Sequence, residues 1–143
     1  MSKKLPIKKS DYIYFQSIST RWNDNDIYGH INNVQYYSYF DTVVNFYLIE
    51  KAGLNIHSSS IVGYAVNSSC NYLSAISYPN MIYVGLRVNK IGNSSVTYGL
   101  AIFKKGSNKA SAYGELTHVF VEKSKNKPTQ IPTKIQNALK KLL

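Results

Sequence analysis

The chain has 143 residues, of which 44% are hydrophobic and 17% are charged, and its formal net charge is +10. This length and composition suit one compact domain with a hydrophobic core and exclude a chain that is disordered throughout. Cys70 is the only cysteine, which excludes an intrachain disulfide. No apolar run approaches the roughly 18 residues of a membrane span, and the basic start MSKKLPIKKS lacks the apolar block of a signal peptide. We therefore expect a cytoplasmic protein with no membrane partner.

The positive charge comes mainly from lysines near the two ends of the chain: Lys3, Lys4, Lys8, Lys9, Lys123, Lys125, Lys127, Lys134, Lys140 and Lys141. A basic field attracts anions, so nucleic acid and a nucleotide-bearing thioester such as coenzyme A are both candidate partners. A solvated surface is the simpler alternative. The lysines do not alternate with aromatic residues, and arginine occurs only at positions 21 and 87. We therefore expect no nucleic-acid partner.

The first predicted elements are a loose basic arm at residues 1–10 and a strand at residues 11–22, where β-branched and aromatic residues alternate with polar ones. From Asn33 the apolar residues follow helical spacing, and Gly53 is a suitable helix stop. Two apolar sets lie on this helix, one from Val34 to Leu48 and one from Tyr36 to Phe46. A helix that is apolar over so much of its circumference is expected to be mostly enclosed.

The second half of the chain is dominated by strand patterns, at residues 61–73, 81–91, 95–104 and 109–122. Short turns join the last three strands, which predicts an antiparallel meander. Glycines within these strands predict bulges, bends or close backbone approaches: Gly85, Gly99 and Gly114. A tail helix is predicted within residues 132–143. The order of elements predicts an α+β domain over residues 1–143, with one sheet wrapped around one helix. Sheet edges invite pairing, so we also expect dimerisation.

The segment RWNDNDIYGHINN, residues 21–33, carries the chemistry-bearing residues of the first half. Gly29 permits a tight turn, and Asn32 or Asn33 is a suitable N-cap for the helix that follows. The first amides of a helix have no internal acceptors, so they can polarise a carbonyl group. A nearby carboxylate, Asp26, could attack that carbonyl or activate a water. A D-x-D pair followed by a helix is more often an Asx turn or a helix cap than a catalytic site, so both interpretations stay open at this point.

The same segment resembles a motif of the hotdog-fold thioesterases. The pattern D-x-D-x-x-G-H-x-N-N-x-x-Y is similar to that of the 4-hydroxybenzoyl-CoA thioesterase and acyl-CoA thioesterase branch, which includes the YbgC-like enzymes. It is carried by Asp24, Asp26, Gly29, His30, Asn32, Asn33 and Tyr36. The order of elements, the S-Y-P-N turn at residues 77–80 and the I-G-N-S-S-V segment at residues 91–96 extend the resemblance over nearly the whole chain.

The resemblance implies a sheet wrapped around the long helix, a homodimer or homotetramer, and active sites at the dimer interface. It implies that Asp26 is the catalytic carboxylate, as nucleophile or as general base. It also implies that the carbonyl-polarising amide lies near Asn33, while Asp24 holds the turn. Members of the family hydrolyse thioesters of coenzyme A or, in some cases, of acyl carrier protein.

Other residues near the motif have two interpretations each. His30 orients the loop or assists a proton transfer. Tyr36 and Tyr37 belong to the core or line an acyl pocket. Asp41 binds a water or a polar acyl end, or it is a solvated or interface residue.

Further along the chain, Lys90, Ser94 and Ser95 are candidates for binding the pantetheine or phosphate groups of coenzyme A. Glu115 and His118 are three residues apart on a predicted strand, so they face opposite sides and do not form an acid–base pair. Cys70 is expected to be a small buried side chain, and no grouping of histidines with cysteine predicts a metal site.

The expected function is therefore an acyl-CoA thioesterase that needs no metal and no bound cofactor, because coenzyme A is part of the substrate. An acyl carrier protein thioesterase is the first alternative. The second is a non-catalytic hotdog protein that binds acyl-CoA or acyl carrier protein.

Overall fold

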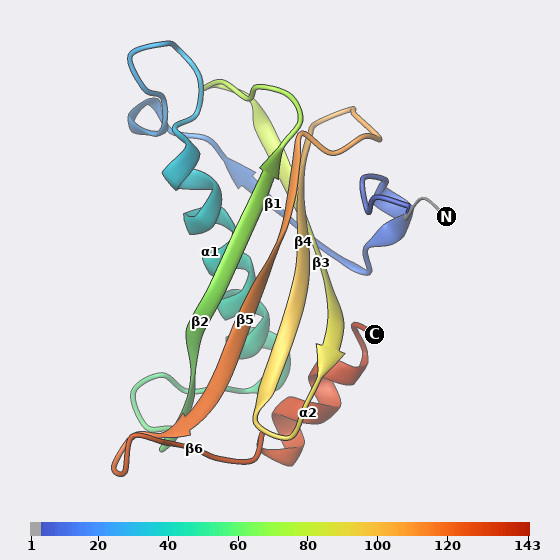
Figure 1. The fold of residues 1–143 in the computed structure, drawn as a ribbon. Coiled ribbons are helices and arrows are strands. Elements are labelled where there is room, and N and C mark those ends of the chain that lie inside the picture. Colours follow the sequence, from blue (N-terminus) through green and yellow to red (C-terminus); the bar gives the residue numbers. More distant parts are fainter. Residues whose placement is uncertain (1–3) are drawn as a thin grey trace.

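The structure is a computed structural model that describes residues 4–143, and in them one antiparallel sheet wraps around one long helix (Figure 1). The strands are β1 (Tyr14–Ser19), β2 (Ile61–Tyr72), β3 (Met81–Ile91), β4 (Ser95–Lys104), β5 (Ala112–Glu122) and β6 (Lys127–Pro128). The helices are α1 (Asn33–Ala52) and α2 (Thr133–Lys140), and two short 3-10 helices flank β1 at Lys9–Asp11 and Trp22–Asp24. This is the hotdog arrangement that the resemblance implies.

Helix α1 begins and ends where its sequence signals predict. The Asn32 side chain accepts a hydrogen bond from the Val34 amide at 3.3 Å, so Asn32 is the N-cap. Gly53 adopts a left-handed conformation with φ of 71°, which ends the helix. The helix therefore has a defined first turn, and the residues before it are held in a fixed position relative to its free amides.

The sheet order is β1-β3-β4-β5-β2, with β6 paired to β5. The meander of β3, β4 and β5 is confirmed, and the bounds of β3 and β4 match the predicted ranges. Strand β1 is shorter than the predicted residues 11–22, because 3-10 turns take up both ends of that range. Strand β6 was not predicted, since it is a pairing of only two residues, one of which is Pro128.

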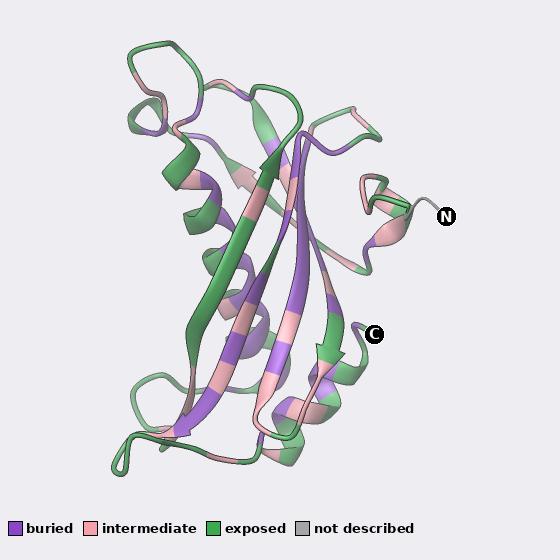
Figure 2. Ribbon diagram, viewed as in Figure 1, coloured by how far each residue is buried: buried purple, intermediate pink, exposed green. Residues whose placement is uncertain are grey.

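The main core lies between α1 and one face of the sheet. Alternate residues of a strand point to opposite faces, and the members of β3 and β4 that face α1 are fully or nearly fully buried. They are Ile82, Val84, Leu86, Val88, Val96, Tyr98, Leu100 and Ile102. Helix α2 adds Ile135, Ala138 and Leu139 to the same cluster. The remaining face of the sheet, here called the outer face, has neither of the two α-helices of residues 4–143 over it (Figure 2).

Helix α1 is less enclosed than its sequence predicts. Val34, Tyr37, Phe46 and Ile49 are 36–59% exposed, on the side of the helix that the sheet does not cover. The reason is geometric, because the sheet of one chain covers only one side of the helix. Strand β2 is likewise exposed along most of its length, as the green ribbon beside α1 shows (Figure 2). Both features lie at the same border of the molecule, where a further chain would be needed to cover them.

The N-terminal arm is not loose in its described part, contrary to the prediction. Lys8 forms a β-bridge with Lys109, and the Ala110 amide donates to the Ile7 carbonyl at 2.8 Å. The Tyr12 hydroxyl donates to the Pro6 carbonyl, also at 2.8 Å. Residues 4–12 are thereby fastened to the outer face of the sheet. Residues 1–3 of the predicted arm lie outside the described residues.

Close packing explains two of the strand glycines. A Cβ atom at Gly114 would collide with the backbone oxygen of Ser69, and one at Gly99 would lie 2.8 Å from Asn89 Oδ1. The prediction of close approaches is confirmed at these positions, while the register shifts of the sheet lie elsewhere, at residues 65–67 and 88–90. Within residues 4–143, neither helix combines the length and the apolarity that a membrane crossing requires.

Candidate functional site

The loop between β1 and α1 is anchored by Asp24, whose side chain is 1% exposed. Its carboxylate accepts hydrogen bonds from the Arg21 amide at 2.9 Å and from the Tyr39 hydroxyl at 2.7 Å, and it forms an ion pair with the Arg21 guanidinium at 3.1 Å. Burial by itself would raise the pKa of Asp24, but these hydrogen bonds and the guanidinium lower it on balance. Every strong interaction of Asp24 is therefore internal, as expected of a residue that holds the turn.

Asp26 lies at the start of a tight turn and keeps part of its carboxylate free. Its Oδ1 accepts the Tyr28 amide at 2.8 Å, its own amide donates to the His30 carbonyl at 2.8 Å, and the Gly29 amide donates to the Asp26 carbonyl at 3.1 Å. Gly29 has a φ of 82°, which a residue with a side chain rarely adopts. Asp26 Oδ2 has no hydrogen-bond partner among residues 4–143. The turn thus fixes one carboxylate oxygen and leaves the second available.

The connection between β2 and β3 braces this loop from the side. The Ile31 amide donates to the Ile76 carbonyl at 2.7 Å, and the Tyr78 amide donates to Asn25 Oδ1 at 3.0 Å. The rings of Trp22 and Tyr78 meet edge to face, with centroids 5.9 Å apart. Residues 22–31 therefore have a defined conformation although they contain little regular structure.

The first amides of α1 can be accounted for one by one. The Asn32 amide donates to the Asp24 carbonyl at 2.8 Å, the Val34 amide to the Asn32 side chain, and the Gln35 amide to the Asn32 carbonyl at 2.9 Å. The Asn33 amide has no acceptor among the described residues. A helix N-terminus carries partial positive charge, so this amide is the available donor for an oxygen that develops negative charge.

A cleft of about 560 Å³ opens between the loop, the first turn of α1 and the end of β2. It is lined by Asp26, His30, Ile31, Asn33, Tyr36, Tyr72, Leu73, Ser74 and Ala75. The free carboxylate oxygen and the free amide both belong to residues of this lining. The cleft lining therefore includes a hydrogen-bond donor and a basic oxygen from two different segments, which are the two kinds of group that acyl transfer to water uses.

The structure brings together some of the predicted site residues and separates others. The cleft is lined by Asp26, His30, Asn33 and Tyr36. Gly29 forms the tight turn before it, and Asn32 caps the helix that borders it. The His30 imidazole is exposed, and the role of this residue in closing the turn belongs to its backbone carbonyl. Tyr37 and Asp41 lie on the uncovered side of α1, outside the cleft, where Asp41 accepts a hydrogen bond from Asn45 at 3.0 Å.

The predicted coenzyme A residues lie at the other end of the sheet. Lys90, Ser94 and Ser95 surround the turn between β3 and β4, close to α2, whereas the first turn of α1 is at the opposite end (Figure 1). The Ser94 and Ser95 carbonyls accept backbone hydrogen bonds from Phe120 and Gly92. Within one chain these three residues do not meet Asp26, so their role in binding stays a prediction.

Five residues of the cleft lining were not predicted from the sequence: Ile31, Tyr72, Leu73, Ser74 and Ala75. Tyr72 ends β2 on the face toward α1, in register with Ala112. Cys70 lies on the same face, half-buried, and burial raises the pKa of its thiol to about 11. The thiol is therefore protonated at neutral pH and is not an activated nucleophile.

Glu115 and His118 lie on opposite faces of the sheet, as predicted. His118 points toward α1, where its Nδ1 shares a 3.3 Å hydrogen bond with the Tyr98 hydroxyl. It is 2% exposed, and this burial lowers the pKa of its imidazole to about 4, against a smaller opposing effect of Asp41. His118 is thus a neutral, buried member of the core at physiological pH.

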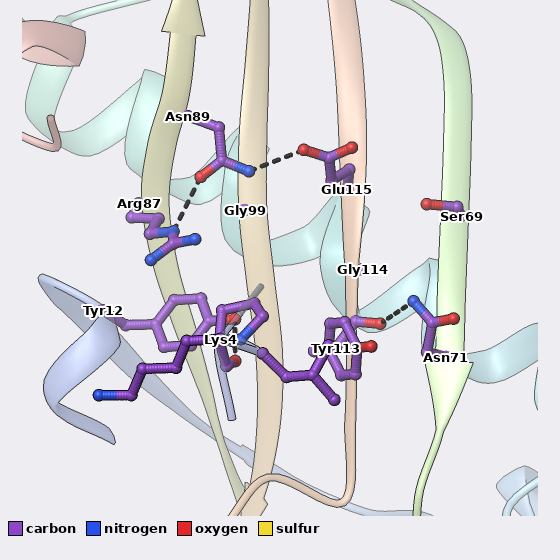
Figure 3. A pocket seen from close by; sticks show the side chains of 12 residues that line it. Lys4, Tyr12, Ser69, Asn71, Arg87, Asn89, Gly99, Tyr113, Gly114 and Glu115 are labelled. Carbon is purple, nitrogen blue, oxygen red and sulfur yellow. Dashed lines mark hydrogen bonds between the residues drawn. The ribbon is translucent and has the colours of Figure 1, made fainter. Parts of the chain in front are cut away.

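A second hollow, of about 290 Å³, lies on the outer face of the sheet (Figure 3). Arg87, Gly99 and Glu115 are register partners across β3, β4 and β5. Asn89 bridges the two charges, accepting from Arg87 Nε and donating to Glu115 Oε2, both at 2.8 Å. Arg87 also donates to the Asp11 carbonyl at 3.0 Å. The polar groups here bind one another across a strand whose glycine makes room for them.

Comparisons with known proteins agree with the fold. The crystal structure of the PA5185 protein from Pseudomonas aeruginosa strain PAO1 is 50% identical, with a TM-score of 0.94 over 95% of each chain. Slr0204 from Synechocystis, a 1,4-dihydroxy-2-naphthoyl-CoA thioesterase, is 15% identical, with a TM-score of 0.80 over 88% of this chain and 94% of that one.

A curated relative, the uncharacterized protein YsmA from Bacillus subtilis (strain 168), is 25% identical over 89 residues. That match covers 62% of this chain and about 60% of the length of YsmA. A family model described as the thioesterase-like superfamily matches residues 20–139, so the chain belongs to that superfamily.

Proposed function

We propose that the protein hydrolyses thioesters, with acyl-CoA as the substrate class and Asp26 as the catalytic carboxylate. The observation that carries the proposal is the pairing of two unused polar groups on one cleft. These are the free carboxylate oxygen of Asp26 and the free amide of Asn33. Membership of the thioesterase-like superfamily supports the reaction type. The name of Slr0204, a CoA thioesterase of the same fold, supports the substrate class.

In the proposed reaction the thioester oxygen accepts a hydrogen bond from the Asn33 amide, which makes the carbonyl carbon more electrophilic. Asp26 then attacks that carbon to give a mixed anhydride that water hydrolyses, or it takes a proton from a water that attacks directly. In either route the carbon–sulfur bond breaks and the CoA thiolate leaves and takes up a proton. The products are the free acid and CoA, and the reaction uses no metal or bound cofactor.

The uncovered border of the molecule supports a homo-oligomer. Strand β2 is an edge strand whose residues 64–69 are all exposed, and the neighbouring side of α1 exposes Val34, Tyr37, Phe46 and Ile49. Unpaired strand edges and exposed apolar patches are usually covered by another chain. We propose that a second copy joins here, completing the cleft and bringing its Lys90, Ser94 and Ser95 toward the substrate. A monomer by light scattering at micromolar concentration would contradict this assembly.

The central test is a thiol-release assay over short, long and aromatic acyl-CoAs, with wild type and Asp26→Asn. We expect Asp26→Asn to lower kcat by at least about 100-fold, because it removes the base or nucleophile while keeping the shape of the side chain. Thermal unfolding should be unchanged, since Asp26 is not part of the core. Near-normal hydrolysis by the variant would rule out the proposed role. Acyl-CoA binding by wild type without thiol release would indicate the non-catalytic binder.

The polarising amide can be tested separately with proline. Asn33 is the first helical residue, a position that tolerates proline, and Asn32 has the extended ψ of 138° that proline requires before it. Asn33→Pro removes the amide hydrogen while the helix is kept. We expect a loss of about 100-fold in kcat. Asn33→Ala, which keeps the amide, is the matched control and should retain most of the activity.

A further inference from the structure

Tyr72 is the last residue of β2 and, among residues 4–143, the only one in the lining of the cleft that belongs to one of the six strands. Its side chain projects from the edge of the sheet toward the start of α1. The β1–α1 loop and the connection from β2 to β3 are joined to each other by backbone hydrogen bonds and by the Asn25 side chain. Tyr72, in contrast, contacts the start of α1 from a strand of the sheet.

Two contacts join Tyr72 to the first turn of α1. Its hydroxyl donates to the Asn33 carbonyl at 3.3 Å, and its ring meets the Tyr36 ring edge to face, with centroids 5.0 Å apart and an angle of 88°. Both partners belong to the turn that presents the free Asn33 amide. An edge-to-face pair and a hydrogen bond together restrain the position and the rotation of that turn.

The phenol is suited to this contact over the neutral pH range. Partial burial, together with nearby Cys70 and Tyr37, raises the pKa of Tyr72. The hydroxyl therefore stays protonated and remains a donor to the carbonyl throughout the range in which the cleft would operate.

We propose that Tyr72 is a positioning residue that holds the Asn33 amide in line with the substrate carbonyl. This inference rests on the proposed thioesterase reaction. Tyr72 is assigned no contact with the reacting atoms. It acts through the first turn of α1, so its loss should weaken transition-state stabilisation more than substrate binding.

The first experiment compares Tyr72→Phe with wild type. The variant keeps the ring contact with Tyr36 and removes the hydrogen bond. We expect kcat to fall by about 3- to 10-fold, the scale of one modest hydrogen bond, while KM stays nearly constant. Tyr83→Phe is the matched control, because Tyr83 lies on the outer face of β3, between β1 and β4, away from the cleft and from the exposed border of β2 and α1. An unchanged kcat in Tyr72→Phe would overturn the proposal.

The second experiment is a double-mutant cycle with Asn33→Pro. If Tyr72 acts through the Asn33 amide, adding Tyr72→Phe to Asn33→Pro should cause no further loss of kcat. Fully additive losses would overturn the positioning role and assign Tyr72 an independent one. If wild type releases thiol from no thioester, the reaction and this inference fall together. If wild type is active and Tyr72→Phe is equally active, only the inference falls.

Discussion

The cleft at the start of α1 and the outer hollow lie on opposite sides of one sheet and differ in how their polar groups are used. On the outer face, Arg87, Asn89 and Glu115 bind one another in a chain of hydrogen bonds. In the cleft at the start of α1, Asp26 keeps one carboxylate oxygen free and Asn33 keeps its amide free. Both places contain a carboxylate and a strong donor, so composition alone does not distinguish them.

This difference between paired and unpaired polar groups indicates which of the two places could bind a polar ligand. Polar groups in folded proteins normally find partners, so groups that are held in place without one call for an explanation. On the outer face the hydrogen bonds are already made, and a ligand would have to replace them. In the cleft the surrounding backbone bonds hold the free groups in place, and a substrate could bind them without breaking any bond.

The largest expected difference between the two hollows is in catalysis. We expect Glu115→Gln to leave kcat within about twofold of wild type, because Glu115 only accepts from Asn89 on the outer face, whereas Asp26→Asn loses at least about 100-fold. Parallel thiol-release assays on the two variants measure this. Comparable losses from both substitutions would break the comparison.

The next effect concerns stability at low pH and belongs to the side that faces α1. The pKa of His118 is lowered from 6.5 to about 4 in the folded protein, so the unfolded chain takes up a proton at a higher pH than the folded one. The stabilisation is fully present above pH 6.5 and is lost as the pH falls toward 4. The free energy of unfolding should decrease by up to about 3 kcal/mol over that interval.

Urea titrations at pH 7, 5.5 and 4 test this dependence. His118→Gln removes the titrating group, so its unfolding free energy should vary less over the same interval. His57→Gln is the control, because His57 is exposed in the loop after α1. Equal pH dependence in wild type and His118→Gln would show that other groups cause the acid sensitivity.

The smallest expected effect is on the outer face. A Cβ atom at Gly99 would meet Asn89 Oδ1 at 2.8 Å and Arg87 Nε at 3.0 Å. These are the ends of flexible side chains, so Gly99→Ala should lower the free energy of unfolding by only about 1 kcal/mol. We expect kcat to be unchanged, and chemical denaturation together with the thiol-release assay checks both. A loss of activity in Gly99→Ala would contradict this prediction and would show that the outer hollow affects the cleft.

Much of the fold could be predicted because its signals are local. Asn32 and Gly53 determine the two ends of α1, and the turns after β3 and β4 are marked by glycine. The limits of β1 could not be predicted, because an aspartate side chain on each side of the strand accepts a backbone amide and stabilises a 3-10 turn there. Asp11 accepts the Lys8 amide at 3.0 Å and Asp24 accepts the Arg21 amide at 2.9 Å. The alternation of polar and apolar residues continues through these turns, so the pattern does not show where the strand ends.

The candidate site was predictable on the loop side and not on the strand side. The resemblance of the motif to hotdog thioesterases implied Asp26 and the amide near Asn33 as site groups, but Tyr72 was missed for a physical reason. A β-bulge between Ala65 and Asn67 exchanges the two faces of β2, so the residues that face α1 are odd-numbered before it and even-numbered after it. Counting alternate residues from Ile61 would place Tyr72 on the outer face. Only the pairing with β5 gives its true direction.

The free Asn33 amide also has a consequence for how this protein tolerates mutation. A catalytic side chain can be lost by any substitution, whereas a backbone amide is kept by every residue except proline. The polarising amide at position 33 is thus unaffected by nearly every substitution there. The carboxylate, in contrast, is lost when Asp26 is replaced. Descendants of this chain that lose activity should therefore be recognisable first at Asp26, while the polarising end of the helix persists in them unchanged.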